Sequence, residues 1–207
     1  MHLQPIGEGT VVGSGVQIAE NVFIGCNCTL DGLIKIGEGT VIEHNVTIMN
    51  EVEIGSDCII HSGTVIGKDG FGYAFDKNNI PVKVPHFGGV VIGDRVEIGS
   101  NCVIDRGTID STIIDDDTKI DSLCIIAHNT TIGKGNLIVG CSNLGGSSTI
   151  GNNSYIGPKT CIKNQVHIGN NCFTGMGTIV YESLEDDVII PKAGSKTIKN
   201  KNYRRFI

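Results

Sequence analysis

The chain has 207 residues, which is enough for one domain with a sizeable core. Its net charge of −6 argues against nucleic-acid binding, because neutralising phosphates requires a basic surface. No apolar run approaches the roughly 18 residues of a membrane span, and residues 1–10 lack a signal-peptide core, so we expect a cytoplasmic protein. Aromatic residues make up only 5% of the chain, so the core must be built from small aliphatic side chains.

Aliphatic residues recur every six positions along most of the chain. A first run extends from Ile6 to Ile66, a short one from Ile92 to Ile104, and a third from Ile114 to Ile168 after a four-residue slip. A period of six fits neither a helix nor an isolated amphipathic strand, but it fits a short flat strand followed by a corner. Three such hexads make one triangular coil, so the sequence predicts an all-β chain folded as a parallel β-helix.

Two further hexad positions are restricted. The residue directly after the aliphatic one is often glycine, as at Gly25, Gly55, Gly99 and Gly133, where we expect it to accept a tight backbone angle. Four positions after the aliphatic residue comes a small or β-branched side chain, which should fill the space left inside the coil.

The eight cysteines fit this small inward position better than a disulfide or metal framework. Five of them occupy it: Cys28, Cys58, Cys102, Cys124 and Cys172. The other three are Cys26, Cys141 and Cys161, and no CxxC spacing joins them. We therefore expect free cysteines that pack as small hydrophobic residues.

Two segments interrupt the repeat. Residues 67–91 form a long excursion that carries Phe71, Tyr73, Phe75 and Phe87. A loop of this length in a regular solenoid is more often functional than decorative, so we expect a lid or clamp over a neighbouring subunit's groove; the alternative is a surface excursion that packs its aromatic residues on the rod. After residue 182 the repeat dissolves. We therefore predict a β-helix domain over 1–182 with an inserted loop, and a basic tail over 183–207 that could meet phosphates or only solvent.

The histidines do not form a metal-binding pattern, since no two of the six lie closer than 17 residues. We expect no metal site and no permanently bound cofactor. His128 stands two positions after Ile126, where a side chain should point outward. Imidazole suits proton transfer near neutral pH, although an outward histidine is more often an ordinary surface residue.

A longer pattern changes that balance. The segments VIGKDGFGYA (65–74), GGVVIGDRVEIGSNCVIDRGTIDSTI (88–113), KIDSLCIIAHNTTIG (119–133) and TGMG (174–177) resemble the lipid A pathway N-acyltransferases. That family transfers a 3-hydroxyacyl chain from acyl carrier protein to the amine of a UDP-linked 3-O-acylglucosamine. The resemblance covers residues 55–182 and implies a left-handed β-helix and a cytoplasmic homotrimer with active sites between subunits.

The resemblance also implies roles for individual residues. His128 matches the general base, and Gly146 the backbone N–H donor to the oxyanion. Asp121 and Asn129 match residues that orient the base or hold the sugar, and Phe71 and Tyr73 fall in the loop that walls the site. Gly140 would let the acyl donor approach the backbone, and Gln165 replaces a second active-site histidine of the family.

Three departures from the family shape the functional prediction. The repeat starts by residue 6, so we expect the family's N-terminal domain to be lacking. The second departure is Gln165, which stands where the family has a histidine. The third is Thr178 and Val180, which stand where the family has methionines that limit the length of a long acyl chain. We therefore predict an acyltransferase that moves an acyl group, most simply acetyl from coenzyme A, to the amine of a nucleotide-linked amino sugar for surface-glycan or lipopolysaccharide synthesis.

Two alternatives remain open from the sequence. One is direct 3-hydroxyacyl transfer from acyl carrier protein to UDP-3-O-acylglucosamine. The other is a non-enzymatic β-solenoid scaffold, which would form filaments rather than a discrete trimer.

Overall fold

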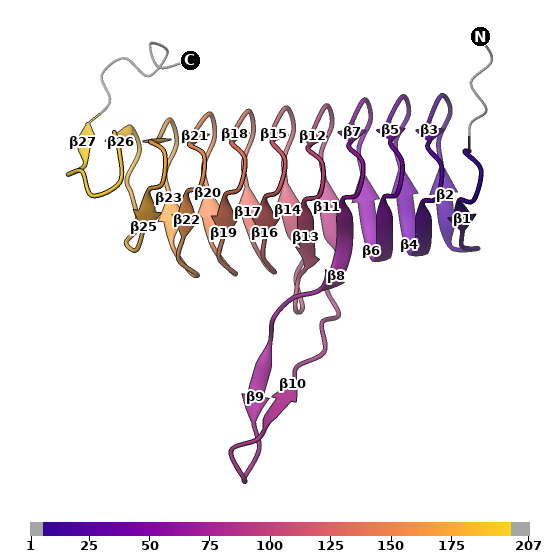
Figure 1. Ribbon diagram of the computed structural model, residues 1–207, viewed down its shortest axis with the longest axis horizontal. Coiled ribbons are helices and arrows are strands. Elements are labelled where there is room, and N and C mark those ends of the chain that lie inside the picture. The colour runs from indigo at the N-terminus through magenta and orange to yellow at the C-terminus, as the bar shows by residue number, and fades with distance from the viewer. Residues whose placement is uncertain (1–5, 200–207) are drawn as a thin grey trace.

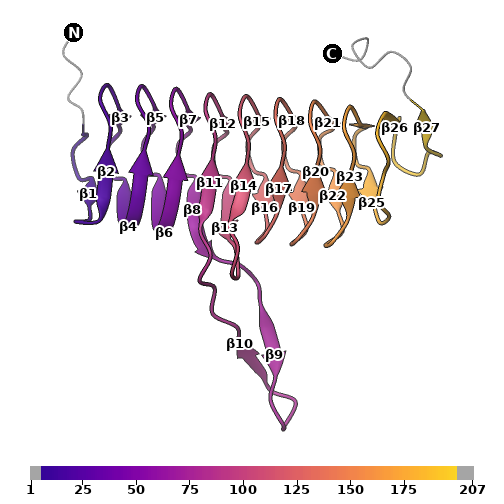
Figure 2. The same ribbon diagram turned by 180° about the vertical axis from the view of Figure 1, so that it is seen from behind.

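A computed structural model of the chain describes residues 6–199, and within them every regular element is a β-strand. Figures 1 and 2 show a straight rod of stacked coils that runs from β1 to β27. Nearly all pairs are parallel, and where the repeat is uninterrupted they join residues 18 apart, such as Ile126 with Leu144 and Ile132 with Ile150. The pairs that span the slip join residues 22 apart, such as Ile104 with Ile126, and those that span the excursion join residues 38 apart, such as Ile66 with Ile104. The predicted fold is confirmed: the coils form a left-handed parallel β-helix.

The rod has three faces, and each face stacks one strand from every coil. Face A is the ten-stranded sheet, which contains β3 (Phe23–Ile24), β5 (Val41–Ile42), β7 (Ile59–Ile60), β12 (Glu97–Ile98), β15 (Lys119–Ile120), β18 (Leu137–Ile138), β21 (Tyr155–Ile156), β24 (Phe173–Thr174), β26 (Val188–Ile190) and β27 (Ile198–Lys199).

Faces B and C belong to one continuous sheet, because β4 (Thr29–Ile36) and β6 (Thr47–Ile54) run without a break across the edge between them. Face B further contains β1 (Val11–Val12), β8 (Val65–Asp69), β13 (Val103–Arg106), β16 (Ile125–Ile126), β19 (Asn143–Leu144), β22 (Cys161–Ile162) and β25 (Ile179–Val180). Face C further contains β2 (Val16–Ile18), β11 (Val90–Ile92), β14 (Thr112–Ile114), β17 (Thr131–Ile132), β20 (Thr149–Ile150) and β23 (His167–Ile168).

The core is the column of side chains that the six-residue period points inward. Residues such as Ile60, Ile98, Ile104 and Ile126 are completely buried. Each strand contributes only two or three residues, so the apolar area needed for stability accumulates from coil to coil.

The small inward position has a second role that the sequence did not indicate. Thr40 Oγ1 donates to the carbonyl of Gly55 at 2.8 Å, and Thr64 Oγ1 donates to that of Gly99 at 2.7 Å. Cys58 Sγ reaches the Gly93 carbonyl in the same way at 3.1 Å. The inward threonines and cysteines thus satisfy corner carbonyls inside the rod. All eight cysteines are free, as predicted, and the five inward ones are buried.

The corner glycines were predicted to accept a tight backbone angle, and this reason was wrong. Gly25, Gly55 and Gly99 do not have positive φ; instead, a Cβ on each would lie 2.5–2.7 Å from atoms of the next coil. Glycine is required there because stacked backbones approach closely. The left-handed conformation falls two residues later, mostly on asparagine and aspartate, such as Asn27 with φ 56° and Asp57 with φ 54°.

The predicted boundaries shift at two places. β8 extends to Asp69 and β11 begins at Val90, so the excursion predicted for 67–91 leaves the rod only between them. Its hairpin of β9 (Tyr73–Phe75) and β10 (Pro81–Lys83) projects from the side of the rod (Figure 1). At the other end Leu184 and Ile190 continue the inward column past residue 182, because β26 pairs in parallel with β24. Residues 200–207 of the predicted tail lie outside the described residues.

Candidate functional site

The excursion and the four-residue slip of the repeat both lie on the edge between faces B and C. The excursion leaves after β8 and returns at β11, one coil before residues 107–111, which join β13 to β14. In the next coil, His128 lies between β16 and β17 on the same edge. Because successive coils stack along this edge, the end of the excursion, the loop after β13 and His128 lie next to one another. Each is about 20 residues from the next in the sequence.

The His128 imidazole is half-buried and lines a cleft of about 400 Å³. The residues that line the cleft are Phe71, Asp105, Ile125, Ala127, His128, Gly146, Ser147, Asn164 and Gln165. Four of the eight residues predicted for the site, His128, Gly146, Phe71 and Gln165, thus line one cleft.

Asn129 determines which nitrogen of His128 carries the proton. Asn129 Oδ1 accepts a hydrogen bond from the Thr108 N–H at 3.0 Å, and its Nδ2 donates to the Asp110 carbonyl at 3.1 Å. These bonds fix the amide orientation, so the contact of 3.1 Å between His128 Nδ1 and Asn129 Oδ1 requires a proton on Nδ1. His128 Nε2 is therefore the nitrogen left to accept a proton.

The four-residue slip in the repeat supplies the partners of Asn129. Residues 107–111 form a loop in which a Cβ on Gly107 would overlap the Asp110 carbonyl and come within 3.0 Å of Asn129 Nδ2. Asn129 itself has φ 58°, a conformation that asparagine tolerates better than most residues. The slip thus has a positioning role that its length alone did not reveal.

Gly146 lies directly beside the proton-accepting nitrogen. It occupies the coil after His128, and a Cβ built on it would lie 2.8 Å from His128 Nε2. Its carbonyl accepts a hydrogen bond from the Gln165 N–H at 3.0 Å. Its own N–H donates to no group within residues 6–199, so that donor remains available to a ligand in the cleft.

Asp105 is a cleft residue to which the sequence assigned no role, although it lies in the IDRG segment that supports the resemblance. It is 5% exposed and is the one charged side chain in the lining of the cleft among the described residues. One carboxylate oxygen, Oδ1, forms an ion pair with Lys68 Nζ at 2.5 Å. The pairing of Asp105 with Lys68 across a β-bulge between β13 and β8 decides this placement. Bulges commonly redirect a side chain beside a functional site.

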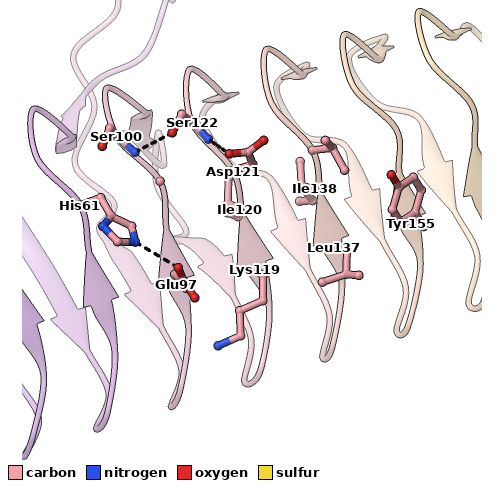
Figure 3. Close-up of a pocket in the computed structure, with 12 residues that line it drawn as sticks. His61, Glu97, Ser100, Lys119, Ile120, Asp121, Ser122, Leu137, Ile138 and Tyr155 are labelled. Carbon is pink, nitrogen blue, oxygen red and sulfur yellow. Dashed lines mark hydrogen bonds and ion pairs between the residues drawn. The ribbon is translucent and has the colours of Figure 1, made fainter. Parts of the chain in front are cut away.

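Asp121 and Gly140 line a different surface from the His128 cleft. Asp121 follows β15, on the edge between faces A and B, and lines a groove of about 480 Å³ along face A (Figure 3). Its carboxylate accepts hydrogen bonds from the N–H groups of Ser122 at 2.7 Å and Gly140 at 3.0 Å. Asp121 and Gly140 are thus brought together, but within one chain neither contacts His128.

The remaining predicted residues have mixed placements. Tyr73 stands behind Phe71, with ring centroids 4.9 Å apart, and does not line the cleft. Thr178 and Val180 are buried in the rod at 1% and 2% exposure, so they cannot limit the length of a bound acyl chain. Met176, Ile179 and Tyr181 are the exposed residues of that segment.

Residues 6–199 contain no group of three or more His, Cys, Asp or Glu side chains suited to holding a metal ion. Within the same residues no helix is long and apolar enough to cross a membrane.

Two hexapeptide-repeat family profiles match the chain. The profile described as bacterial transferase hexapeptide (six repeats) matches residues 34–68 and 147–182. The profile described as hexapeptide repeat of succinyl-transferase matches residues 15–50 and 89–121. Together these four matches cover most coils of the rod.

Curated relatives carry one recurring name. A UDP-3-O-acylglucosamine N-acyltransferase of Coxiella burnetii is 38% identical over 149 residues, which is 72% of this chain and 43% of the relative. The enzyme of the same name from Delftia acidovorans is 37% identical over 125 residues, covering 60% of this chain and 32% of the relative. The chain therefore spans less than half the length of these relatives.

Solved structures share the fold at lower identity. UDP-N-acetylglucosamine acyltransferase from Campylobacter jejuni superposes with a TM-score of 0.83 at 22% identity, covering 96% of this chain and 77% of that one. The corresponding acyltransferase of Bacteroides fragilis gives 0.81 at 20% identity, covering 99% and 78%. The repeat, the β-helix and both profiles agree that this chain is a hexapeptide-repeat protein, similar in sequence to bacterial acyltransferases that carry the same repeat.

Proposed function

We propose that the chain is an N-acyltransferase that moves an acyl group from a thioester donor to the amine of a nucleotide-linked amino sugar. The observation that supports this most directly is the pairing of His128 Nε2 with the unused N–H of Gly146 across one cleft. A proton acceptor beside an anion-stabilising donor is the arrangement that acyl transfer requires. The relatives' shared name, UDP-3-O-acylglucosamine N-acyltransferase, supports the same chemistry.

In the proposed reaction the acceptor amine attacks the thioester carbonyl carbon. His128 Nε2 takes the proton that the amine loses as the C–N bond forms, and Asn129 Oδ1 holds the Nδ1–H of the developing imidazolium. The Gly146 N–H stabilises the negative charge on the carbonyl oxygen. The C–S bond then breaks, and the leaving thiolate receives a proton from His128.

Asp105 supports an amine as the acceptor. Amines of sugars are largely protonated at neutral pH, and a buried carboxylate in the wall of the cleft favours a cationic or donor-rich group. Asp105 would hold the cationic amine in the cleft, and the amine attacks after this first proton has passed to solvent. His128 Nε2 then takes the second proton, the one lost as the C–N bond forms.

The acyl group and its carrier are the finer parts of the proposal. Acetyl from coenzyme A is the shorter candidate, and a 3-hydroxyacyl chain from acyl carrier protein, the donor of the lipid A reaction, is the longer one. The case for acetyl no longer rests on Thr178 and Val180, because both side chains point into the core. The relatives' name states an acylated glucosamine as acceptor and gives no length for the transferred acyl group, so a comparison of the two donors decides between them.

We further propose that the chain acts as a homotrimer in which neighbouring chains close the cleft. The cleft is bordered by Phe71, which is 84% exposed, and by Ile125 on face B, which is 42% exposed. Apolar side chains of this size beside a polar site are common where another chain packs. Gel filtration with light scattering should give a discrete trimer, whereas a scaffold protein would give filaments and a lone monomer would contradict the proposal.

The function is tested by thiol release from acetyl-CoA and from 3-hydroxyacyl carrier protein, each with UDP- and dTDP-linked amino sugars. His128→Ala should lower turnover by about 10²–10⁴-fold, the usual contribution of a general base. His44→Ala, which changes an exposed histidine elsewhere on the rod, is the matched control. Near-normal turnover of His128→Ala at saturating substrates would exclude the assigned base.

A further inference from the structure

The excursion brings a second histidine against His128. His86 lies near the end of the excursion and is 4% exposed, while His128 belongs to a coil 42 positions later in the chain. The two ring centroids are 5.3 Å apart and the planes make an angle of 76°, which is an edge-to-face contact. Such contacts between rings fix their relative orientation.

Two glycines of the GKDGFG segment make room for the two imidazoles. A Cβ on Gly70 would lie 2.7 Å from His128 Cδ2 and 2.9 Å from His128 Cβ. A Cβ on Gly72 would lie 2.9 Å from His86 Cε1. The first arm of the excursion therefore packs on both rings, and the second arm carries His86.

The hydrogen bonding of His86 holds it within the excursion. Its Nδ1 lies 3.1 Å from the Val84 carbonyl, and the Val84 N–H donates to the Gly72 carbonyl at 3.0 Å. These bonds tie His86 to both arms. The other nitrogen, Nε2, is buried and has no hydrogen-bond partner within residues 6–199. A buried nitrogen without a partner is uncommon and needs a reason. The contact of the His86 ring with the His128 ring is such a reason, and it does not depend on a hydrogen bond.

We propose that His86 is a positioning residue that holds the His128 ring in the orientation where Nδ1–H meets Asn129 and Nε2 faces Gly146. The inference rests on the proposed role of His128 only for its kinetic consequence. The positioning itself is a property of the folded chain and can be measured without substrate.

The direct test is the long-range ¹H–¹⁵N spectrum of the full chain labelled in histidine, with the His128 signals assigned by their loss in His128→Gln. The wild type should show one set of His128 signals with Nδ1 protonated and Nε2 bare. His86→Ala should give a second set or a mixture of tautomers, because the ring loses its perpendicular neighbour. His86→Phe, which keeps a ring in that place without the buried nitrogen, should restore one set.

His44→Ala serves as the control and should leave the His128 signals unchanged. If His86→Ala does not yield folded protein, His86→Leu fills most of the volume without a planar ring and is measured in the same way. Unchanged His128 signals in the alanine or leucine variant would overturn the proposal.

Kinetics then separate positioning from a general loss of structure. His86→Ala should lower kcat by tenfold or more while the acceptor KM stays within threefold, and His86→Phe should recover most of kcat. A loss confined to KM, or no recovery with phenylalanine, would contradict a positioning role. Absence of any acyl transfer in the wild type would instead count against the proposed function, and the spectra would still test the ring contact.

Discussion

Asn129 Oδ1 accepts a hydrogen bond from the His128 Nδ1–H at 3.1 Å, and the same amide is held by Thr108 and Asp110 from the preceding coil. The slip in the six-residue repeat interrupts the regular stacking of the coils. Its loop holds Asn129 and thereby fixes the tautomer of the proposed base. The orientation of one side chain in the site depends on a loop that precedes it by about 20 residues.

Replacing Asn129 should therefore impair the base without removing it. Asn129→Ala is expected to lower kcat by about tenfold or more, because Nδ1–H loses its acceptor and either nitrogen can carry the proton. Asn153→Ala is the matched control, since Asn153 occupies the same left-handed corner position with φ 54° away from the cleft. Steady-state kinetics of both variants test this, and equal loss in the two would show that only backbone strain is at work.

Gly146→Ala should abolish activity while leaving the rod stable. Gly146 does not have positive φ, but the added Cβ would lie 2.8 Å from His128 Nε2 and fill the space where acceptor and thioester meet. Gly145→Ala makes the opposite change, because its Cβ would lie 2.5 Å from the backbone nitrogen of Asn164 in the next coil. Gly146→Ala should lose activity and keep its melting temperature, whereas Gly145→Ala should have a lower melting temperature. A Gly146→Ala enzyme with normal turnover would contradict the proposed geometry.

Asp105→Asn tests the proposed recognition of the amine. The substitution keeps the shape but removes the charge that would hold a protonated amine, so the acceptor KM should rise by about tenfold while the donor KM changes little. Glu53→Gln is the control, because it removes the partner of Lys35 in an exposed ion pair far from the cleft. If the donor KM rises instead, Asp105 faces the thioester substrate rather than the sugar.

His61 should make stability depend on pH near neutrality. The Glu97 carboxylate, with help from Glu43, raises the pKa of His61 above its ordinary value, against a smaller lowering by burial. A raised folded-state pKa gives stabilisation that is fully present below the unfolded value of about 6.5 and is lost as pH rises through the folded value.

Melting temperatures measured across this range check the effect. The wild type should be more stable than His61→Gln, and this difference in stability should be larger at pH 5.5 than at pH 9. The change corresponds to a free energy of unfolding of roughly 0.5 kcal/mol, which is typical of partly exposed ion pairs. A difference that does not change with pH would show that His61 contributes by packing alone.

Leu123→Asn should stabilise the chain. Leu123 has φ 63° and is 56% exposed, so it occupies a left-handed corner that most coils give to asparagine or aspartate, and it buries little apolar area in return. Relief of the strain should be worth about 0.5–1 kcal/mol, measured by denaturant unfolding. Leu33→Asn, at a similarly exposed leucine within β4, should not stabilise. Equal effects at both positions would show that surface polarity, not φ, is responsible.

The sequence by itself determined the rod. A six-residue period states which side chain enters the core of every coil, and that rule does not depend on any distant contact, so Ile60, Ile104 and Cys58 were placed correctly. The same local rule failed for Gly25 and Gly55, because the restriction there comes from the neighbouring coil and not from the residue's own backbone angle.

Only the tertiary structure decided how the site is assembled. His128 could be picked from its motif, but Asp105 reaches the cleft through the β-bulge that pairs it with Lys68. His86 contacts His128 because the excursion returns to the rod along the same edge of the prism. Asp121 stands seven residues before His128, yet it lies on another edge, because a hexad turns the chain by one face of the triangle. Neighbours in a β-helix are set by stacking of coils, so distance along the sequence is a poor guide to distance across the site.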